Sequence, residues 1–304
     1  MTRVLVLGGT GTIGRATVRA LLDQDHRVRC LIRRGSPPPE GAECQEGSAS
    51  DPADLDRAMA GVDAVISCLA SRTGAPSDAW AVDHRANLAA LRAAEGAGVS
   101  HFVLLSAICV QRPRLAFQRA KLAFEAALSA SALTWSIVRP TAYFKSLSGQ
   151  VSRVRAGKPF LVFGDGKLTR CAPISDADLG AYLVGCLTDR DRQNRILPVG
   201  GPGPALTPRE IGTALAEALG QEPRFRQIPL GLLNGIIGGL SVAGHLSPRL
   251  AEKAELARIA RYYATESMLL WNPSAGRYDA DATPRTGQDT LQAHFARLAA
   301  GEAP

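Results

Sequence analysis

Short apolar runs alternate with longer amphipathic segments through the first half of the chain. The runs hold four to six residues, which suits buried strands, and the segments between them show the spacing of helices. Strands separated by helices of this length predict a parallel, doubly wound α/β sheet with right-handed crossovers. We expect strands at 4–7, 27–32, 64–67, 101–105 and 135–139, and helices ending at residue 22 and covering 51–59, 78–97 and 121–128.

The rhythm changes after Pro140. Short apolar runs at 160–163 and 195–199 are now mixed with helical patterns at 175–186, 207–219 and 248–263. This mixture predicts a smaller C-terminal lobe with its own short strands. We expect some of its elements to return to the parallel sheet.

Composition narrows the class of protein. The 304 residues are 46% hydrophobic and 21% charged, which is an ordinary globular balance, and the net charge is +7 with a pI near 9.3. No Lys/Arg run is interleaved with aromatic residues, so we do not expect nucleic-acid binding. The six cysteines contain no C-x-x-C pair, which predicts free thiols. The five histidines are scattered along the chain, so we expect no metal site.

Two features bear on location. The first expected strand begins close to Arg3, which leaves no room for a leader and predicts a cytoplasmic protein. The longest uncharged stretch, residues 227–246, contains Pro229 and five glycines, so it is a poor candidate for a transmembrane helix.

A glycine-rich loop follows the first expected strand. Glycine at the first, fourth and seventh positions lets the backbone turn tightly and approach a pyrophosphate, and the helix that follows offers its amide donors. We therefore expect an NADP-binding Rossmann domain over 1–142 and a substrate-binding lobe over 143–304. The cofactor contacts expected in the loop are Gly8, Thr10, Gly11, Thr12, Ile13 and Gly14.

Arg33 and Arg34 follow the second expected strand. NAD-binding domains usually place an acidic residue there for the ribose hydroxyls, whereas a guanidinium suits a 2′-phosphate by its charge and by its bidentate geometry. The pair predicts NADPH as the cofactor. Further cofactor contacts are expected where later strands end, at Ser67, Cys68, Leu69, Ala70 and Pro140.

Ser106 follows the expected strand 101–105, and Lys121 lies in the helix after it. In short-chain dehydrogenases that reduce carbonyls, such a pair frames a tyrosine four residues before the lysine, whose phenol protonates the new alkoxide. Phe117 stands at that position here. The missing phenol indicates either the reduction of something other than a carbonyl or no catalysis at all.

The remaining candidates take roles around this frame. We expect Lys121 to hold the nicotinamide ribose, with Ser106 as its catalytic partner, and Phe117 to wall the nicotinamide site. Tyr143 and Lys145 are candidates for a substitute proton donor.

The glycine loop, the segment Leu31-Ile32-Arg33 and the tyrosine-less Lys121 resemble the atypical, NmrA-like branch of short-chain dehydrogenases. Longer stretches narrow the resemblance to the NADPH-dependent divinyl chlorophyllide 8-vinyl reductase family, and the similarity spans nearly the whole chain. These stretches are residues 104–111, 117–125, 136–150, 163–167 with 173–175, and 261–269.

The resemblance implies reduction of the 8-vinyl group of divinyl chlorophyllide or protochlorophyllide to ethyl, in chlorophyll or bacteriochlorophyll synthesis. The partner would be a magnesium tetrapyrrole, which is flat, apolar and carries a carboxylate. Negative charge formed on hydride addition would delocalise into the macrocycle, which agrees with the missing phenol. Substrate contacts are then expected at Phe117, Tyr143, Phe144, Leu233 and Ile237.

Several questions stay open at this level. Arg112, Arg114 and Lys167 are each candidates to meet the carboxylate, and their spacing selects none of them. Compared with plastid members of the family, the sequence shows no long N-terminal targeting extension, and we therefore expect a bacterial cytoplasm. Peripheral contact with a photosynthetic membrane is left open, and the oligomeric state is unknown. The rival hypotheses are a non-catalytic NADP(H)-binding regulator or assembly factor, and an enone or quinone reductase.

Overall fold

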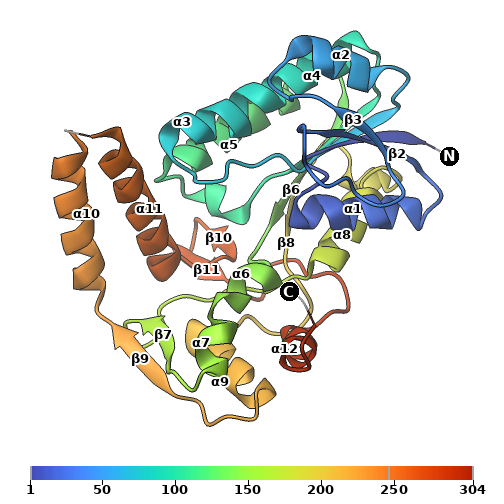
Figure 1. The fold of residues 1–304 in the computed structure, drawn as a ribbon. Helices are drawn as coiled ribbons and strands as arrows, with labels where there is room; N and C mark the ends of the chain where they lie inside the picture. Colours follow the sequence, from blue (N-terminus) through green and yellow to red (C-terminus); the bar gives the residue numbers. More distant parts are fainter. Residues whose placement is uncertain (1, 246, 303–304) are drawn as a thin grey trace. The chain divides into compact units, whose positions relative to one another are not determined.

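The computed structural model describes residues 2–245 and 247–302 and contains a seven-stranded sheet (Figure 1). The strand order is β3-β2-β1-β4-β5-β6-β8, and every pairing with a resolved register is parallel. The order reverses between β1 and β4, which is where ligands bind in doubly wound sheets. The predicted α/β class is therefore confirmed. The strands are β1 (Arg3–Leu7), β2 (Arg27–Ile32), β3 (Glu43–Glu46), β4 (Ala64–Ser67), β5 (His101–Leu105), β6 (Thr134–Pro140) and β8 (Arg195–Val199).

Two compact units make up the chain, and the first holds most of this sheet with residues Met1–Pro140 and Asp176–Leu197. Its core contains the fully buried rings of Phe102 and Phe124, whose centroids lie 5.9 Å apart. The helices of this unit are α1 (Thr12–Leu22), α2 (Pro52–Met59), α3 (Pro76–Ala79), α4 (Asn87–Gly96), α5 (Ala116–Ser129) and α8 (Asp176–Gly185), with short helical turns η1 (Trp80–Ala86), η2 (Ile108–Gln111) and η4 (Arg190–Arg192).

The helix expected over 78–97 is interrupted. It consists of α3, a seven-residue π-helical segment η1, and α4. A π-helical segment shifts the side chains that follow it around the helix axis, and such segments occur often at functional sites. The prediction was wrong about continuity because an Ala-rich pattern fits either kind of turn.

Helix α5 begins at Ala116, five residues earlier than expected. The fully buried Gln118 fixes this start, because its Oε1 accepts hydrogen bonds from the backbone N–H groups of Arg114 at 2.7 Å and Leu115 at 2.9 Å. Its Nε2 donates to the carbonyl of Cys109 at 3.1 Å. These three hydrogen bonds tie α5 to the segment that follows β5.

The second unit comprises Thr141–Ser175 and Pro198–Pro304. It carries a parallel pair, β7 with β9, and an antiparallel hairpin, β10 with β11. The assignment of nucleotide and substrate binding to 1–142 and 143–304 stays a prediction. The elements are α6 (Phe144–Leu147), η3 (Ser148–Gln150), α7 (Val151–Arg155), β7 (Phe160–Phe163), α9 (Pro208–Ala218), β9 (Phe225–Ile228), α10 (Leu230–Gly244), α11 (Pro248–Thr265), β10 (Leu270–Asn272), β11 (Arg277–Asp279) and α12 (Leu291–Ala299).

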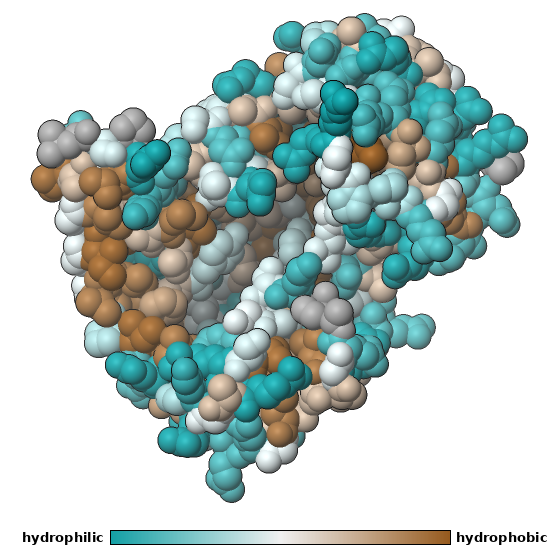
Figure 2. Space-filling view, viewed as in Figure 1, coloured by the Kyte–Doolittle hydropathy of each residue, from teal (hydrophilic) through white to brown (hydrophobic). Residues whose placement is uncertain are grey.

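Helix α10 was not expected from the sequence. It has no charged residue, and of its fifteen residues only Leu233 is buried. Leu232, Ile236 and Val242 are exposed, and Figure 2 shows hydrophobic surface gathered over this helix. Within the described residues, none of the helices has both the length and the apolar character needed to cross a membrane.

Candidate cofactor site and buried lysine network

The loop after β1 has the geometry of a phosphate-binding turn. Gly8 has φ of +75°, and a Cβ at this position would lie 2.8 Å from the carbonyl oxygen of Cys68. A Cβ on Gly14 would overlap the carbonyl oxygen of Gly8 and lie 2.8 Å from the Cα of Gly9. Both glycines are therefore required by close backbone approaches at the point where the strand order reverses.

Helix α1 begins within this loop, and its first turn contains no acidic residue. Its N-cap is Gly11, which has no side chain to compete for the amide groups of the first turn, whereas Asp51 caps α2 by accepting from the N–H of Ala53 at 2.9 Å. The positive end of α1 thus suits an anionic ligand such as a dinucleotide pyrophosphate. The residues of this loop fit the cofactor that the sequence predicts.

Arg15 connects the phosphate loop to the segment that follows β2. Its Nε donates to the carbonyl of Thr10 at 3.1 Å, and its guanidinium donates to the carbonyl of Pro37 at 2.8 Å. Arg33 and Arg34 lie between β2 and this Pro37 anchor, and both are exposed. Their backbone is therefore held close to the glycine loop while their charged ends face solvent.

Among the other expected cofactor contacts, Ser67 ends β4 and Pro140 ends β6, and both are buried. Burial raises the pKa of the Cys68 thiol to about 12, so it remains a neutral, unreactive side chain at physiological pH. Leu69 is half-buried and Ala70 is exposed. Ser67 to Ala70 lie at the carboxyl end of β4, on the same edge of the sheet as the glycine loop.

Lys121 forms a buried ion pair. Its Nζ lies 3.0 Å from Oδ1 of Asp83, and the two side chains are 10% and 1% exposed. Asp83 belongs to η1, so the π-helical segment carries the carboxylate that meets α5. Taking one partner from such a pair would leave an uncompensated buried charge, which typically costs about 3–5 kcal/mol.

The other oxygen of Asp83, Oδ2, is buried without a hydrogen-bond partner in the structure. Asn87 supports the same turn, because its Nδ2 donates to the carbonyls of Val82 at 3.1 Å and Asp83 at 3.3 Å. Its Oδ1 accepts from the hydroxyl of Ser67 at 2.6 Å. We call Ser67, Asp83, Asn87 and Lys121 the lysine network, and it joins the end of β4 to α5.

Ser106 lies in a second buried network. Its hydroxyl donates to Glu125, and the guanidinium of Arg139 donates to the same carboxylate, with Nε 3.1 Å from Oε1. The Ser106 proton is thus directed to a carboxylate and not outward to a ligand. Glu125 and Arg139 fix the ends of β5 and β6 relative to α5.

Phe117, Lys121 and Glu125 are spaced four residues apart and share one face of α5. All three are buried, and Phe117 is 9% exposed. No phenol stands one turn before the lysine, so this face offers an ammonium and an apolar ring where carbonyl reductases offer a lysine and a tyrosine. The role of Phe117 beside the nicotinamide stays a prediction.

The remaining predicted residues belong to the second unit. Tyr143 is half-buried and precedes α6, and Lys145 is exposed. Phe144 is almost completely buried, with its ring centroid 5.2 Å from that of His294, so in this structure it packs in the core. Leu233 is buried and Ile237 half-buried, whereas the exposed face of α10 carries their neighbours Leu232 and Ile236. Their assignment as proton donors and substrate contacts stays a prediction.

Sequence reasoning missed the residues that hold this site together. Asp83 and Asn87 were absorbed into an expected Ala-rich helix, and Arg15 into the first amphipathic helix. The sequence does indicate a role for Glu125, because it lies four residues after Lys121 and therefore on the same face of the helix. Nothing local indicates its contact with Arg139.

Comparisons with known proteins agree with this geometry. Residues 8–190 match the family described as NAD(P)H-binding. The chain is 48% identical to the divinyl chlorophyllide a 8-vinyl-reductase, chloroplastic, of Zea mays, over 98% of this chain and 79% of that protein, and 45% identical to the protein of the same name in Arabidopsis thaliana, over 97% and 76%. A solved structure of the NADPH-dependent quinone oxidoreductase QOR2 of Escherichia coli, complexed with NADPH, is similar with a TM-score of 0.69, 16% identity, and coverage of 97% and 99%.

These relatives correct one expectation. They carry the description chloroplastic, which contradicts the prediction of a bacterial cytoplasmic protein. That prediction depended on where the sequence begins relative to its first strand, and this position carries no information about the compartment.

Proposed function

The chain belongs to the divinyl chlorophyllide a 8-vinyl-reductase family, and we propose that it reduces the 8-vinyl group of a divinyl magnesium tetrapyrrole to ethyl with NADPH as the reductant. The observation that carries this proposal is 48% identity over 98% of the chain to a protein with that name. The buried face of α5 supports it, because Lys121 is present there without a tyrosine. An oxidoreductase of this family has no alkoxide to protonate when it reduces a carbon–carbon double bond.

The preference for NADPH over NADH is part of the proposal. Arg33 and Arg34 support it, since they are exposed, follow β2, and lie on a segment that Arg15 holds to the glycine loop. A 2′-phosphate accepts bidentate hydrogen bonds from a guanidinium, and no acidic side chain directly follows β2 to favour ribose hydroxyls. The glycine loop and the N-terminus of α1 would hold the pyrophosphate.

When bound, the reduced nicotinamide supplies a hydride for the terminal vinyl carbon, and a proton completes the ethyl group. Lys121 would hold the nicotinamide ribose through its ammonium group. Asp83 would keep that ammonium in one position, and Asn87 would keep the η1 turn in place. Phe117 would wall the nicotinamide site and exclude water from it.

The macrocycle can delocalise the charge that follows hydride addition, so the proton need not come from an adjacent strong acid. Tyr143 and Lys145 are the proposed donors, with water as the alternative source. Ser106 would act through Glu125, because its proton is directed to that carboxylate. The first unit would thus hold the dinucleotide and the second the pigment.

Substrate cover and membrane contact are proposed for the second unit. An apolar macrocycle would meet Tyr143, Leu233 and Ile237, as the family resemblance suggests, whereas Phe144 is packed in the core. The exposed apolar positions of α10 would let the protein rest on the surface of a membrane that holds such pigments. Flotation with anionic vesicles tests this contact, and a Leu232→Ser variant should weaken it.

The decisive assay supplies divinyl chlorophyllide and NADPH to the purified protein. The proposal predicts NADPH oxidation with a matching shift of the pigment absorption band, and no comparable turnover of small enones or quinones. A protein that binds NADPH but leaves the pigment unchanged would instead be a regulator or assembly factor. The Phe117→Tyr variant should show no gain of activity, and a large gain would contradict the proposed vinyl chemistry.

A further inference from the structure

A basic cavity of about 440 Å³ lies within the second unit. It is bounded by the segment after β7 and by the first turns of α9. Three of its six lining side chains are cationic and one is acidic. The lining residues are Lys167, Arg170, Thr207, Arg209, Glu210 and Thr213.

Glu210, the acidic residue of the lining, already accepts hydrogen bonds from Thr207. Oε2 of Glu210 accepts from the backbone N–H of Thr207 at 2.7 Å and from its hydroxyl at 2.8 Å, and this capping box satisfies the start of α9. These hydrogen bonds, with smaller contributions from Arg170 and Lys167, hold the pKa of Glu210 below its usual value. Glu210 remains ionised, and one carboxylate cannot neutralise three cations.

The cations are anchored through their backbones. The N–H of Arg170 donates to Ser267 at 3.0 Å, and the N–H of Arg209 donates to the carbonyl of Gly166 at 3.0 Å. The guanidinium carbon of Arg209 lies 4.4 Å from the centroid of the Phe225 ring, which orients it. In the part of the chain that the structure describes, neither arginine nor Lys167 forms an ion pair.

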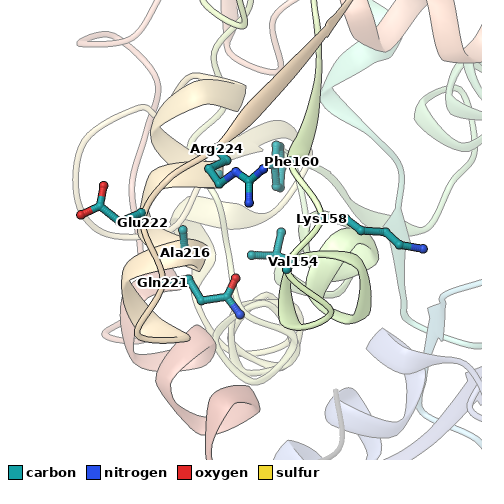
Figure 3. A pocket seen from close by; sticks show the side chains of 9 residues that line it. Val154, Lys158, Phe160, Ala216, Gln221, Glu222 and Arg224 are labelled. Carbon is teal, nitrogen blue, oxygen red and sulfur yellow. The ribbon is translucent and has the colours of Figure 1, made fainter.

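A second cavity in the same unit provides a contrast (Figure 3). Its volume is about 250 Å³, and its lining mixes Arg224 and Lys158 with Glu222 and with the apolar Val154 and Phe160. Figure 3 shows Lys158 and Glu222 pointing outward, away from the apolar side chains. This cavity therefore lacks the concentration of uncompensated positive charge that marks the basic cavity.

We propose that the basic cavity binds the carboxylate of the tetrapyrrole substrate, an inference that rests on the proposed function. An unpaired arginine or lysine is stabilised by an oxyanion, and arginine binds a carboxylate through two parallel hydrogen bonds. Lys167 is one of three candidates that the sequence left open for this role, and the fold adds Arg170 and Arg209 to it. Arg112 and Arg114 belong to the other unit.

Equilibrium binding without cofactor tests the proposal directly. The dissociation constants of divinyl chlorophyllide and of its methyl ester, in which the carboxylate charge is removed, are measured by pigment fluorescence. The wild type should bind the acid about tenfold more tightly than the ester, which is the effect of one charged hydrogen bond of about 1.4 kcal/mol. In the Arg170→Gln/Arg209→Gln variant this ratio should fall to about one, while binding of the ester stays unchanged.

Arg224→Gln is the matched control, because it removes an arginine from the other cavity of the same unit. It should keep the wild-type ratio. An acid-to-ester ratio that persists in the double variant would overturn the proposal, and so would a wild type that does not distinguish the two pigments. Line broadening of inorganic phosphate in ³¹P spectra that disappears in the double variant, together with equal binding of the acid and the ester by the wild type, would assign the cavity to a phosphate and overturn the carboxylate assignment.

Turnover separates this proposal from the proposed function. If the protein reduces the pigment, the double variant should raise KM about tenfold for the acid with kcat nearly unchanged. If the pigment binds with the expected acid preference but is never reduced, the cavity assignment stands and the reductase assignment fails. If reduction proceeds and the variant leaves KM unchanged, the cavity assignment alone fails.

Discussion

The lysine network of the first unit and the basic cavity of the second treat charge in opposite ways. In the network, the ammonium of Lys121 meets a carboxylate, and the amide of Asn87 makes three hydrogen bonds. In the basic cavity, the positive charges of Lys167, Arg170 and Arg209 have no ion-pair partner among the described residues. The network pairs its ammonium group within the fold, whereas solvent or a ligand must balance the cations of the basic cavity.

The apolar surface shows the same difference. Phe102 and Phe124 of the first unit are fully buried, whereas Leu232, Ile236 and Val242 of α10 face solvent. A preorganised site pays little ordering cost when its ligand binds, and a site with unpaired charge and exposed apolar area gains most of its stabilisation from the ligand. The glycine loop and the lysine network are thus ordered by contacts within the chain, while the surfaces proposed for the pigment carry unpaired charge and exposed apolar area.

The largest expected effect breaks the network at its carboxylate. Asp83→Ala leaves the Lys121 ammonium buried without a partner, so we expect a loss of about 3–5 kcal/mol in the free energy of unfolding. Urea denaturation measures it. Asp83→Asn keeps the shape but not the charge, and it should raise KM for NADPH more than it lowers kcat.

Asp78→Ala serves as the control. Asp78 lies in neighbouring α3, and its carboxylate accepts hydrogen bonds from the backbone N–H and the hydroxyl of the exposed Thr73. It should cost about 1 kcal/mol or less. Equal losses in the Asp83 and Asp78 variants would contradict the importance of the buried pair.

The next effect concerns the glycine loop. Gly14→Ala places a methyl group into the carbonyl oxygen of Gly8, and we expect roughly a hundredfold loss of NADPH affinity because the loop must shift. Fluorescence titration of the cofactor measures it.

Gly96→Ala is the matched change in a helix with open space around the new methyl group. It should leave NADPH affinity unchanged and stabilise α4 slightly, by up to about 1 kcal/mol. Similar affinities for the two variants would show that the close approach at Gly14 does not matter.

Lowering the pH should destabilise the protein through protonation of His101. Burial lowers the pKa of this β5 histidine from 6.5 to about 4, so the unfolded chain binds a proton more readily than the folded one. The stabilisation linked to neutral His101 is fully present above pH 6.5 and is lost as the pH falls toward 4. At pH 5 the free energy of unfolding should be lower by about 2 kcal/mol. Urea denaturation at pH 7 and pH 5 measures this, and a His101→Gln variant should lose about 2 kcal/mol less between the two.

A smaller effect is expected on the preference for NADPH over NADH. Arg33→Ala should reduce the ratio of kcat/KM for NADPH to that for NADH about tenfold, because one charged contact to the 2′-phosphate is lost. Arg27→Ala, at the opposite end of β2, should leave the ratio unchanged. An unchanged ratio in both variants would show that Arg33 does not bind the 2′-phosphate of NADPH.

The sequence predicted what depends on local pattern. Six of the seven strands of the large sheet and the glycine loop were predicted, because apolar runs and a three-glycine spacing are continuous in the chain. The edge strand β3, Glu43–Glu46, was not expected, because it has no apolar run. The pair of Asp83 with Lys121 joins residues far apart in the sequence, and it depends on a π-helical turn that an Ala-rich pattern does not reveal. Arg170 and Arg209 likewise meet only through tertiary structure.

Helix α10 was missed for a different reason. Its five glycines and the preceding Pro229 argue against a helix at the sequence level, because glycine lowers helix propensity by about 1 kcal/mol per residue. Pro229 instead stands at the N-cap, where a missing N–H costs nothing. Packing against α11 then compensates for the weak helix propensity, and this long-range contact is not visible in the segment alone.

In the proposed reaction, hydride adds to the terminal vinyl carbon while the macrocycle, and not a phenol, accommodates the charge. The most direct measurement follows the label from NADPH deuterated at the transferred position of its nicotinamide ring. We expect product with one deuterium on the terminal carbon of the new ethyl group and a solvent proton on the inner carbon. Deuterium on the inner carbon, or an ethyl group labelled only from solvent, would contradict it.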